Sequence, residues 1–456
     1  MARDVVDAEI IESRDDLVAW LAAGGKPSES FRIGVEHEKF PFYAADLKPV
    51  PYEGERGVRA LLEGAKARLG WTPIEDGGAL IGLFDPESGG AISLEPGGQF
   101  ELSGAPLPDA HAVAAELDAH LACMHAVGDS LGVGFLALGL SPKWTFAETP
   151  AMPKSRYRIM ARYMPKVGTR GLDMMFRTST AQTNLDFADE ADMVAKLRVG
   201  LALQPMITAL FANSPFEDGK PTGFLSTRSE IWRHTDPQRT GMLDFAFAPG
   251  MGFERYVDYA LDVPLYFVKR DAVYHDVAGA SFRDLLAGNL AALPGERATV
   301  SDWANHLSTI FPEVRLKRYL EMRGADVGSR ERIVALTAFC LGVFYDKSAL
   351  DAAAELTRAW TAGDLQRLRA DAPRLGLKAR IGARTLGDVA RDAVAIARGG
   401  LERRARRDSA GRDETVYLAP LEQTVDEGRS PAETWLERFN GPWQGSVDPI
   451  FREAAI

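Results

Sequence analysis

Residues 91–106 are AISLEPGGQFELSGAP, a stretch that predicts two short strands joined by a tight turn. Pro96 and Gly97 suit the central positions of such a turn, because proline fixes φ and glycine tolerates positive φ. The flanking residues then pair as a hairpin with two different faces. The apolar face holds Ile92, Leu94, Phe100 and Leu102, and the polar face holds Ser93, Glu95, Gln99 and Glu101. The stretch therefore predicts a sheet that gathers acids on one face.

The stretch GVEHEKF, residues 34–40, places more acids in an apolar run. Residues two apart in a strand share a face and lie roughly 6.5–7 Å apart. Glu36 and Glu38 therefore point the same way, whereas His37 points to the other side and is predicted to be structural. Two neighbouring carboxylates without a cation repel each other and are costly to bury. An isolated Glu-x-Glu would favour a solvated sheet face, but the hairpin supplies a second acidic strand pair.

A third stretch, RTSTAQTNLDF at 177–187, adds Gln182, Asn184 and Asp186 in the same alternating phase. Carboxylates and amides on one face suit a hard cation such as Mg²⁺, which also binds waters and substrate phosphates. With basic residues nearby, such a site favours phosphoryl transfer. The basic candidates, any one of which alone would be a surface charge, are Arg156, Arg158, Lys166, Arg170, Arg228, Arg233 and Arg239. The sequence has no P-loop, dinucleotide-binding or H-E-x-x-H motif.

The organisation of the chain changes near residue 270. Residues 1–270 alternate helical and strand patterns, with long helices predicted at 107–132 and 189–215, the second kinked at Pro205, and strands at 132–140 and around Arg228 in STRSEIW. From about residue 281 the pattern is almost wholly helical. We predict an α+β fold in which residues 1–270 form the catalytic sheet region and the mainly helical residues 271–456 pack on it as one compact unit.

Composition and charge limit the class of protein. The 456 residues are 46% hydrophobic and 26% charged, which is typical of a soluble protein with a large core. The net charge of -11 argues against a nucleic-acid or anionic-membrane binder. Neither a signal peptide nor a membrane span is predicted near the N-terminus. Cys123 and Cys340 lie in apolar helical patterns and are predicted to be packed, without a disulfide. We expect a cytoplasmic protein, monomeric or homodimeric.

Seven blocks of the sequence, in this order, resemble the plant-type glutamate–cysteine ligases, a family with many proteobacterial members. The blocks are GVEHEKF, SLEPGGQFELSGAP, YMPKVG, TNLDF, LALQPMITALFANSPFEDGKP, RTGML and GFERYVDYALDVPLYFVKR. The resemblance runs from about residue 30 to beyond 440. The family belongs to the carboxylate–amine ligase superfamily, which shares its sheet with glutamine synthetase. The resemblance therefore implies a curved, mainly antiparallel sheet that holds ATP and Mg²⁺ on its concave face, with helices outside.

The implied reaction joins the γ-carboxylate of L-glutamate to the amine of L-cysteine through γ-glutamyl phosphate, at the expense of ATP. This is the first step of glutathione biosynthesis. By motif position, the resemblance assigns Mg²⁺ binding to Glu36, Glu38, Glu95 and Glu101. It assigns substrate or nucleotide binding to Gln182, Asn184, Arg228, Arg233 and Tyr266, and catalytic roles to Arg228 and Lys166. One departure is Ser179, where the R-T-C-T-V-Q-like strand of the family has a cysteine.

Three other functions remain open at this point. The site could join glutamate to another amine or activate another carboxylate. A guanidino kinase uses a related sheet but needs no pocket for a second amine. A binding protein could keep the fold without catalysing a reaction. The acidic residues that share one face of the predicted strands argue against that function. ADP release with glutamate alone, and then with added amines, distinguishes these functions.

Overall fold

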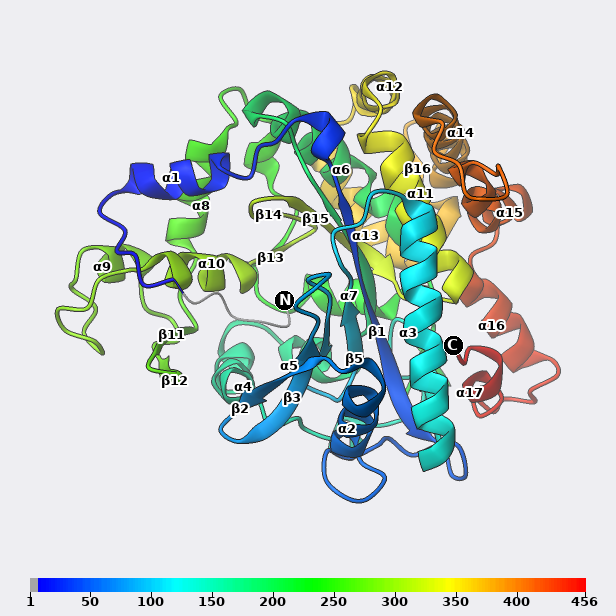
Figure 1. Ribbon diagram of the computed structural model, residues 1–456. Helices are drawn as coiled ribbons and strands as arrows, with labels where there is room; N and C mark the ends of the chain where they lie inside the picture. The colour runs from blue at the N-terminus through cyan, green and yellow to red at the C-terminus, as the bar shows by residue number, and fades with distance from the viewer. Residues whose placement is uncertain (1–6) are drawn as a thin grey trace.

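The computed structural model describes residues 7–456, in which one large sheet lies between layers of helices (Figure 1). The strands of this sheet are β1 (Ile33–Tyr43), β2 (Thr72–Asp76), β3 (Ala79–Phe84), β4 (Ala91–Leu94), β5 (Phe100–Ser103), β6 (Val133–Leu136), β7 (Thr180–Leu185), β14 (Val314–Leu316) and β15 (Leu320–Asp326). Their order is β14-β15-β7-β1-β5-β4-β3-β2, with β6 paired to the second half of β1. The strands pair antiparallel throughout. The predicted α+β class and antiparallel sheet are confirmed.

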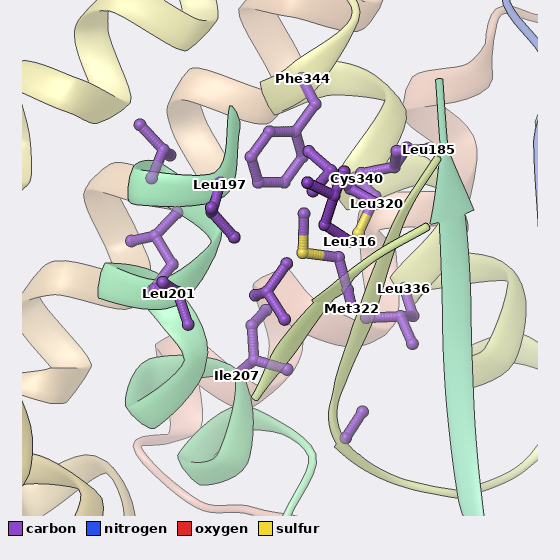
Figure 2. Close-up of a cluster of buried hydrophobic side chains, with 14 of the residues drawn as sticks. Leu185, Leu197, Leu201, Ile207, Leu316, Leu320, Met322, Leu336, Cys340 and Phe344 are labelled. Carbon is purple, nitrogen blue, oxygen red and sulfur yellow. The ribbon is translucent and has the colours of Figure 1, made fainter. Parts of the chain in front are cut away.

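Three long helices, α3 (Ala110–Leu131), α6 (Glu190–Leu210) and α11 (Arg330–Phe344), cover one face of the sheet. Figure 2 shows part of this core. It labels Leu197, Leu201 and Ile207 of α6, Leu336, Cys340 and Phe344 of α11, and Leu316, Leu320 and Met322 of the sheet. By length and composition α6 could cross a membrane, but 83% of its most apolar window is buried inside the protein, as in a core helix.

The other helices lie on the opposite face of the sheet, around its edges, or packed against α3, α6 and α11. Those that face the cavity described below are α4 (Ser155–Val167), α5 (Gly171–Arg177) and α7 (Thr227–Arg233). The rest are α1 (Arg14–Ala22), α2 (Val58–Leu69), α8 (Phe253–Asp262), α9 (Phe282–Leu286), α10 (Val300–Ser308), α12 (Lys347–Thr357), α13 (Ala362–Leu375), α14 (Leu386–Arg404), α15 (Ala419–Glu427), α16 (Pro431–Asn440) and α17 (Ile450–Glu453). Short two-stranded sheets pair β8 (Phe216–Glu217) with β9 (Lys220–Pro221), β10 (Thr240–Gly241) with β13 (Phe311–Pro312), β11 (Phe267–Arg270) with β12 (Val273–Asp276), and β16 (Arg380–Ile381) with β17 (Arg384–Thr385).

The hairpin predicted at residues 91–106 is present as β4 and β5. The amide of Gly98 donates to the carbonyl of Glu95 at 2.9 Å, so Pro96 and Gly97 occupy the central positions of the turn. The apolar face of the hairpin is buried against α2 and α3. On β1, His37 points to that same side and its ring meets His120 of α3 at 5.4 Å between centroids. The predicted alternation along β1 is therefore confirmed.

Three details of the predicted fold are wrong. Strands β14 and β15 come from the mainly helical region after residue 270, so the catalytic sheet is not confined to residues 1–270. STRSEIW forms helix α7 and not a strand, because the Ser226 hydroxyl caps its first turn by accepting from the Ser229 amide. The strand predicted at 132–140 is limited to β6.

Candidate active site

One cavity of about 900 Å³, its mouth included, opens on the face of the sheet opposite α3, α6 and α11. Strands β1, β5, β7, β14 and β15 form its floor, and α4, α5 and α7 form its walls. The charged residues that line it are Glu36, Glu38, Glu95, Glu101, Arg156, Arg228, Arg315 and Arg323. Acidic residues cluster over β1 and β5, with Arg156 near Glu95, and guanidinium groups cluster over β14 and β15.

The acidic end brings three glutamates from two strands and a turn together. Glu38 of β1 lies directly opposite Glu101 of β5, an arrangement that destabilises a sheet when both groups are charged. The carboxylate of Glu101 accepts hydrogen bonds of 2.7 Å from Ser93 and from Ser103. Glu95 follows β4 and accepts from the Tyr157 hydroxyl at 3.2 Å. These contacts hold the acids in place.

The electrostatics of this end favour uptake of a cation. Burial raises the pKa of Glu38 well above its ordinary value, and the charges of Glu95 and Glu101 raise it further. Burial and Glu101 likewise raise the pKa of Glu95, against the opposing effect of Lys154 and Arg156. A nearby cation would relieve both shifts, because it favours the charged form of each carboxyl group.

The donor set at this end fits Mg²⁺, which takes oxygen ligands and usually keeps waters or phosphate oxygens in its shell. In residues 7–456 no group of three His, Cys, Asp or Glu side chains is close enough to hold an ion by itself. A metal here would therefore take one or two of the acids together with oxygens from water or from a phosphorylated ligand.

The charged side chains of the basic end form ion pairs within the protein. Glu321 of β15 is fully buried and lies 2.6 Å from Arg315 and 2.9 Å from Lys317, and it also pairs with Arg323. Although burial opposes its ionisation, these cations lower the pKa of Glu321 well below its ordinary value. One carboxylate thus faces three cations, so this end keeps an excess of positive charge.

A β-bulge shapes the basic end. The register between β15 and β7 shifts between Met322 and Ala325, so Arg323 lies in the irregular part of the strand. Its side chain donates to Gln182 of β7 at 2.6 Å. Arg228 of α7 donates to the carbonyl of Arg323 at 2.9 Å, and its guanidinium is 3.8 Å from Asp326. Bulges commonly redirect side chains beside active sites, and this one joins two arginines from distant parts of the chain.

Glu36 and the amides of β7 lie between the two ends. Gln182 is opposite Glu36 in the register of β1 and β7, and both residues line the cavity. Asn184 is not part of the lining, but its side-chain amide donates to Glu36 at 3.0 Å. Asp186 lies farther along, where it accepts from Lys26 and from the Arg32 amide. Of the two amide residues predicted for the site, Gln182 lines the cavity, whereas Asn184 holds Glu36 in position.

Three residues assigned to the site lie outside the cavity lining. Lys166 is exposed in the last turn of α4. Arg233 forms an ion pair with Glu230 at 2.6 Å, one turn away on its own helix. Tyr266 is buried, with the Arg239 guanidinium 3.6 Å from the centre of its ring. Arg233 and Tyr266 therefore contact other parts of the protein, whereas Lys166 is exposed to solvent.

Several lining residues were not assigned from the sequence. Arg315 and Arg323 stand in a region predicted to be helical, although the alternation in LEMRGAD is a strand signal. Arg156 was one of several basic candidates without a distinguishing feature. The aromatic part of the wall consists of Tyr157, Trp232, Phe267 and Phe311. No local pattern marks these aromatic residues, because the fold brings them together from separate segments.

Comparisons with known proteins show to which family this chain is related. The chain is 52% identical over 449 residues to the chloroplastic glutamate–cysteine ligase of Nicotiana tabacum, covering 98% of this chain and 84% of that protein. It is 52% identical over 441 residues to the chloroplastic enzyme of Arabidopsis thaliana, covering 97% and 82% respectively. The expected cytoplasmic location is contradicted by these relatives, since they are named as chloroplastic enzymes.

A solved structure of the glutamate–cysteine ligase of Francisella tularensis in complex with AMP has the same fold. The TM-score is 0.54 at 13% identity, over 93% of this chain and 87% of that one. The model of the family described as glutamate-cysteine ligase family 2 matches residues 32–453. With that match and relatives at about half identity over nearly the whole chain, the chain belongs to glutamate–cysteine ligase family 2.

Proposed function

We propose that the chain catalyses the ATP- and Mg²⁺-dependent ligation of the γ-carboxylate of L-glutamate to the amine of L-cysteine through γ-glutamyl phosphate. The observation that carries this proposal is the separation of charge inside one cavity. An acidic end suits a metal-bound triphosphate, and a basic end suits the carboxylates of amino acids. Membership of the family supports the two amino acids, and the AMP bound to the neighbour of the same fold supports a nucleotide.

The chemistry explains why both ends are needed. A carboxylate is a poor electrophile, so one of its oxygens must become part of a leaving group before an amine can displace it. Transfer of the γ-phosphoryl group of ATP does this, but it brings two anions together. Mg²⁺ bound by one or two of Glu38, Glu95 and Glu101 would offset that repulsion. The acids of this chain are therefore needed for the transfer step.

The basic end holds the carboxylate substrate in reach of the phosphate. Arg228 and Arg323 offer planar guanidinium groups that can grip a carboxylate with two parallel hydrogen bonds. Their positions are fixed by Asp326, Gln182 and Glu321. This fixed geometry lowers the entropic cost of bringing the reactants together. Binding by these arginines and reaction at the acids then occur within one cavity.

The direct test is an assay of the purified protein with ATP, Mg²⁺, glutamate and cysteine. We expect γ-glutamylcysteine and ADP in equal amounts, and no product after removal of metal with EDTA. Omitting cysteine, and then replacing it with other amines, separates this reaction from ligation to a different acceptor. Absence of γ-glutamylcysteine with all substrates and metal present would contradict the proposal.

A further inference from the structure

A second, smaller chamber adjoins the basic end of the cavity. It encloses about 310 Å³, its mouth included, and shares Arg228, Trp232, Phe311 and Arg323 with the main cavity. Its inner wall adds Thr240 and Gly241 of β10, Glu313, and Arg369 of α13. No role assigned to the site above uses Arg369.

Three residues that line this chamber carry buried hydrogen-bond donors without a partner. The donors are Arg228 Nε, Trp232 Nε1 and Arg369 Nη2, and none of them has an acceptor within residues 7–456. Arg228 is itself only 3% exposed. Buried N–H groups are nearly always paired, and leaving one unpaired is costly. Three such donors on the wall of one small chamber therefore indicate a missing acceptor.

The charge of the chamber also favours an anion. Three guanidinium groups, those of Arg228, Arg323 and Arg369, line it together with one carboxylate, Glu313. Glu313 accepts from Arg369 Nε at 2.6 Å, and the Nη2 of that guanidinium has no acceptor within residues 7–456. Arg323 has its own carboxylate, Glu321, outside this lining. Arg228 lies 3.8 Å from Asp326, which is also outside the lining. A small anion would supply the missing hydrogen-bond acceptor without displacing these ion pairs.

The backbone at Gly241 leaves room beside Arg369. Gly241 has φ of +108°, and a Cβ built there would lie 3.3 Å from the Arg369 guanidinium carbon. A larger residue at 241 would press on that group, and its backbone conformation would be strained. The local structure thus keeps space around the guanidinium.

We propose that this chamber binds the α-carboxylate of an amino-acid substrate, with Arg369 as one of its ligands. A carboxylate fits better than a phosphate, because the chamber lies beyond the basic end, away from the acids that suit a metal-bound triphosphate. The aromatic rings of Trp232 and Phe311 offer a surface for the carbon atoms next to the carboxylate. The proposal rests on the proposed function, and the carboxylate belongs to either glutamate or cysteine.

The test compares Arg369→Gln and Arg369→Lys with the wild type. For Arg369→Gln we expect the KM of one amino acid to rise about tenfold or more, because a charge-assisted hydrogen bond is lost. The KM of ATP should change less than twofold, and Arg369→Lys should recover part of the affinity. Arg367→Gln, on the exposed side of the same helix, is the matched control.

The identity of the affected substrate assigns the carboxylate. If only the KM of glutamate rises, the chamber binds the α-carboxylate of glutamate. If only the KM of cysteine rises, it binds the α-carboxylate of cysteine. The matching analogue without that carboxylate, 4-aminobutyrate or cysteamine, should lose less than twofold in kcat/KM on Arg369→Gln. An unchanged KM for both amino acids, or an equal loss with the analogue, overturns this proposal. A wild type that makes no γ-glutamylcysteine overturns the proposed function instead.

Discussion

The acidic and basic ends of the cavity share one face of one sheet, but they balance their charge differently. At the basic end, Glu321, Asp326 and Glu313 are already paired with arginines, so those side chains are held in position without a ligand. At the acidic end, Glu38 and Glu101 lie opposite each other, and the charge of Glu101 helps to raise the pKa of Glu38. The first end is preorganised for binding, whereas the second is complete only with a cation. Changes at the acidic end should therefore affect turnover, and changes at the basic end should affect affinity.

The largest effect is expected at the acidic end. Glu38→Gln or Glu95→Gln should lower kcat by a factor on the order of 10²–10³, because each removes charge that the metal and phosphate require. Glu75→Gln, on exposed β2, is the control. Steady-state kinetics at saturating Mg²⁺ checks this. Wild-type kcat in either variant would show that these acids do not bind the catalytic metal.

A smaller effect, mainly on affinity, is expected at the basic end. Arg228→Lys or Arg323→Lys keeps the charge but loses the planar fork, so the KM for an amino acid should rise roughly tenfold. Arg233→Lys, on the same helix as Arg228 but outside the cavity, should leave KM unchanged. If Arg228→Lys and Arg323→Lys leave KM unchanged while Arg233→Lys raises it, Arg228 and Arg323 do not form the substrate-binding end.

The two ends also differ in how far the sequence predicts them. The acidic end comes from β1 and one hairpin, whose period of two and Pro-Gly turn are local signals. The basic end requires α7, two late strands and a bulge, brought together by contacts between residues far apart in the chain. Arg228 illustrates the difference: its residue type pointed to the site, but its helix, its bond to Arg323 and its place in two cavities follow from tertiary structure.

A modest stability effect should distinguish the ends in the absence of ligands. Since the pKa of Glu38 is raised above its ordinary value near 4.5, its native form loses stability as pH rises. Glu38→Gln avoids this loss, so at pH 8 its Tm should exceed that of the wild type by roughly 1–3 °C. The difference should shrink toward pH 4.5 and on addition of Mg²⁺. Thermal unfolding across pH measures it, and a difference independent of pH would contradict the repulsion described here.

The smallest effect on activity is expected from oxidation of the two cysteines. Cys123 lies in the core under the hairpin, and Cys340 accepts from Thr183 of β7 at 3.1 Å. Both thiols are free and buried. Burial raises the pKa of Cys340 to about 12, against the opposing Thr183 bond, so little reactive thiolate forms. Thiol titration should find neither group before unfolding and both after it. A large, reductant-reversible change in activity on oxidation would contradict this prediction.

The central claim is that one cavity activates the γ-carboxylate at its acidic end while its basic end holds the amino acid. The most direct measurement follows ¹⁸O from the γ-carboxylate of labelled glutamate during turnover with ATP, Mg²⁺ and cysteine. If γ-glutamyl phosphate forms, one ¹⁸O per product molecule must appear in the released phosphate, because the amine displaces that oxygen with the phosphoryl group. Phosphate free of ¹⁸O, with γ-glutamylcysteine still forming, would contradict the account.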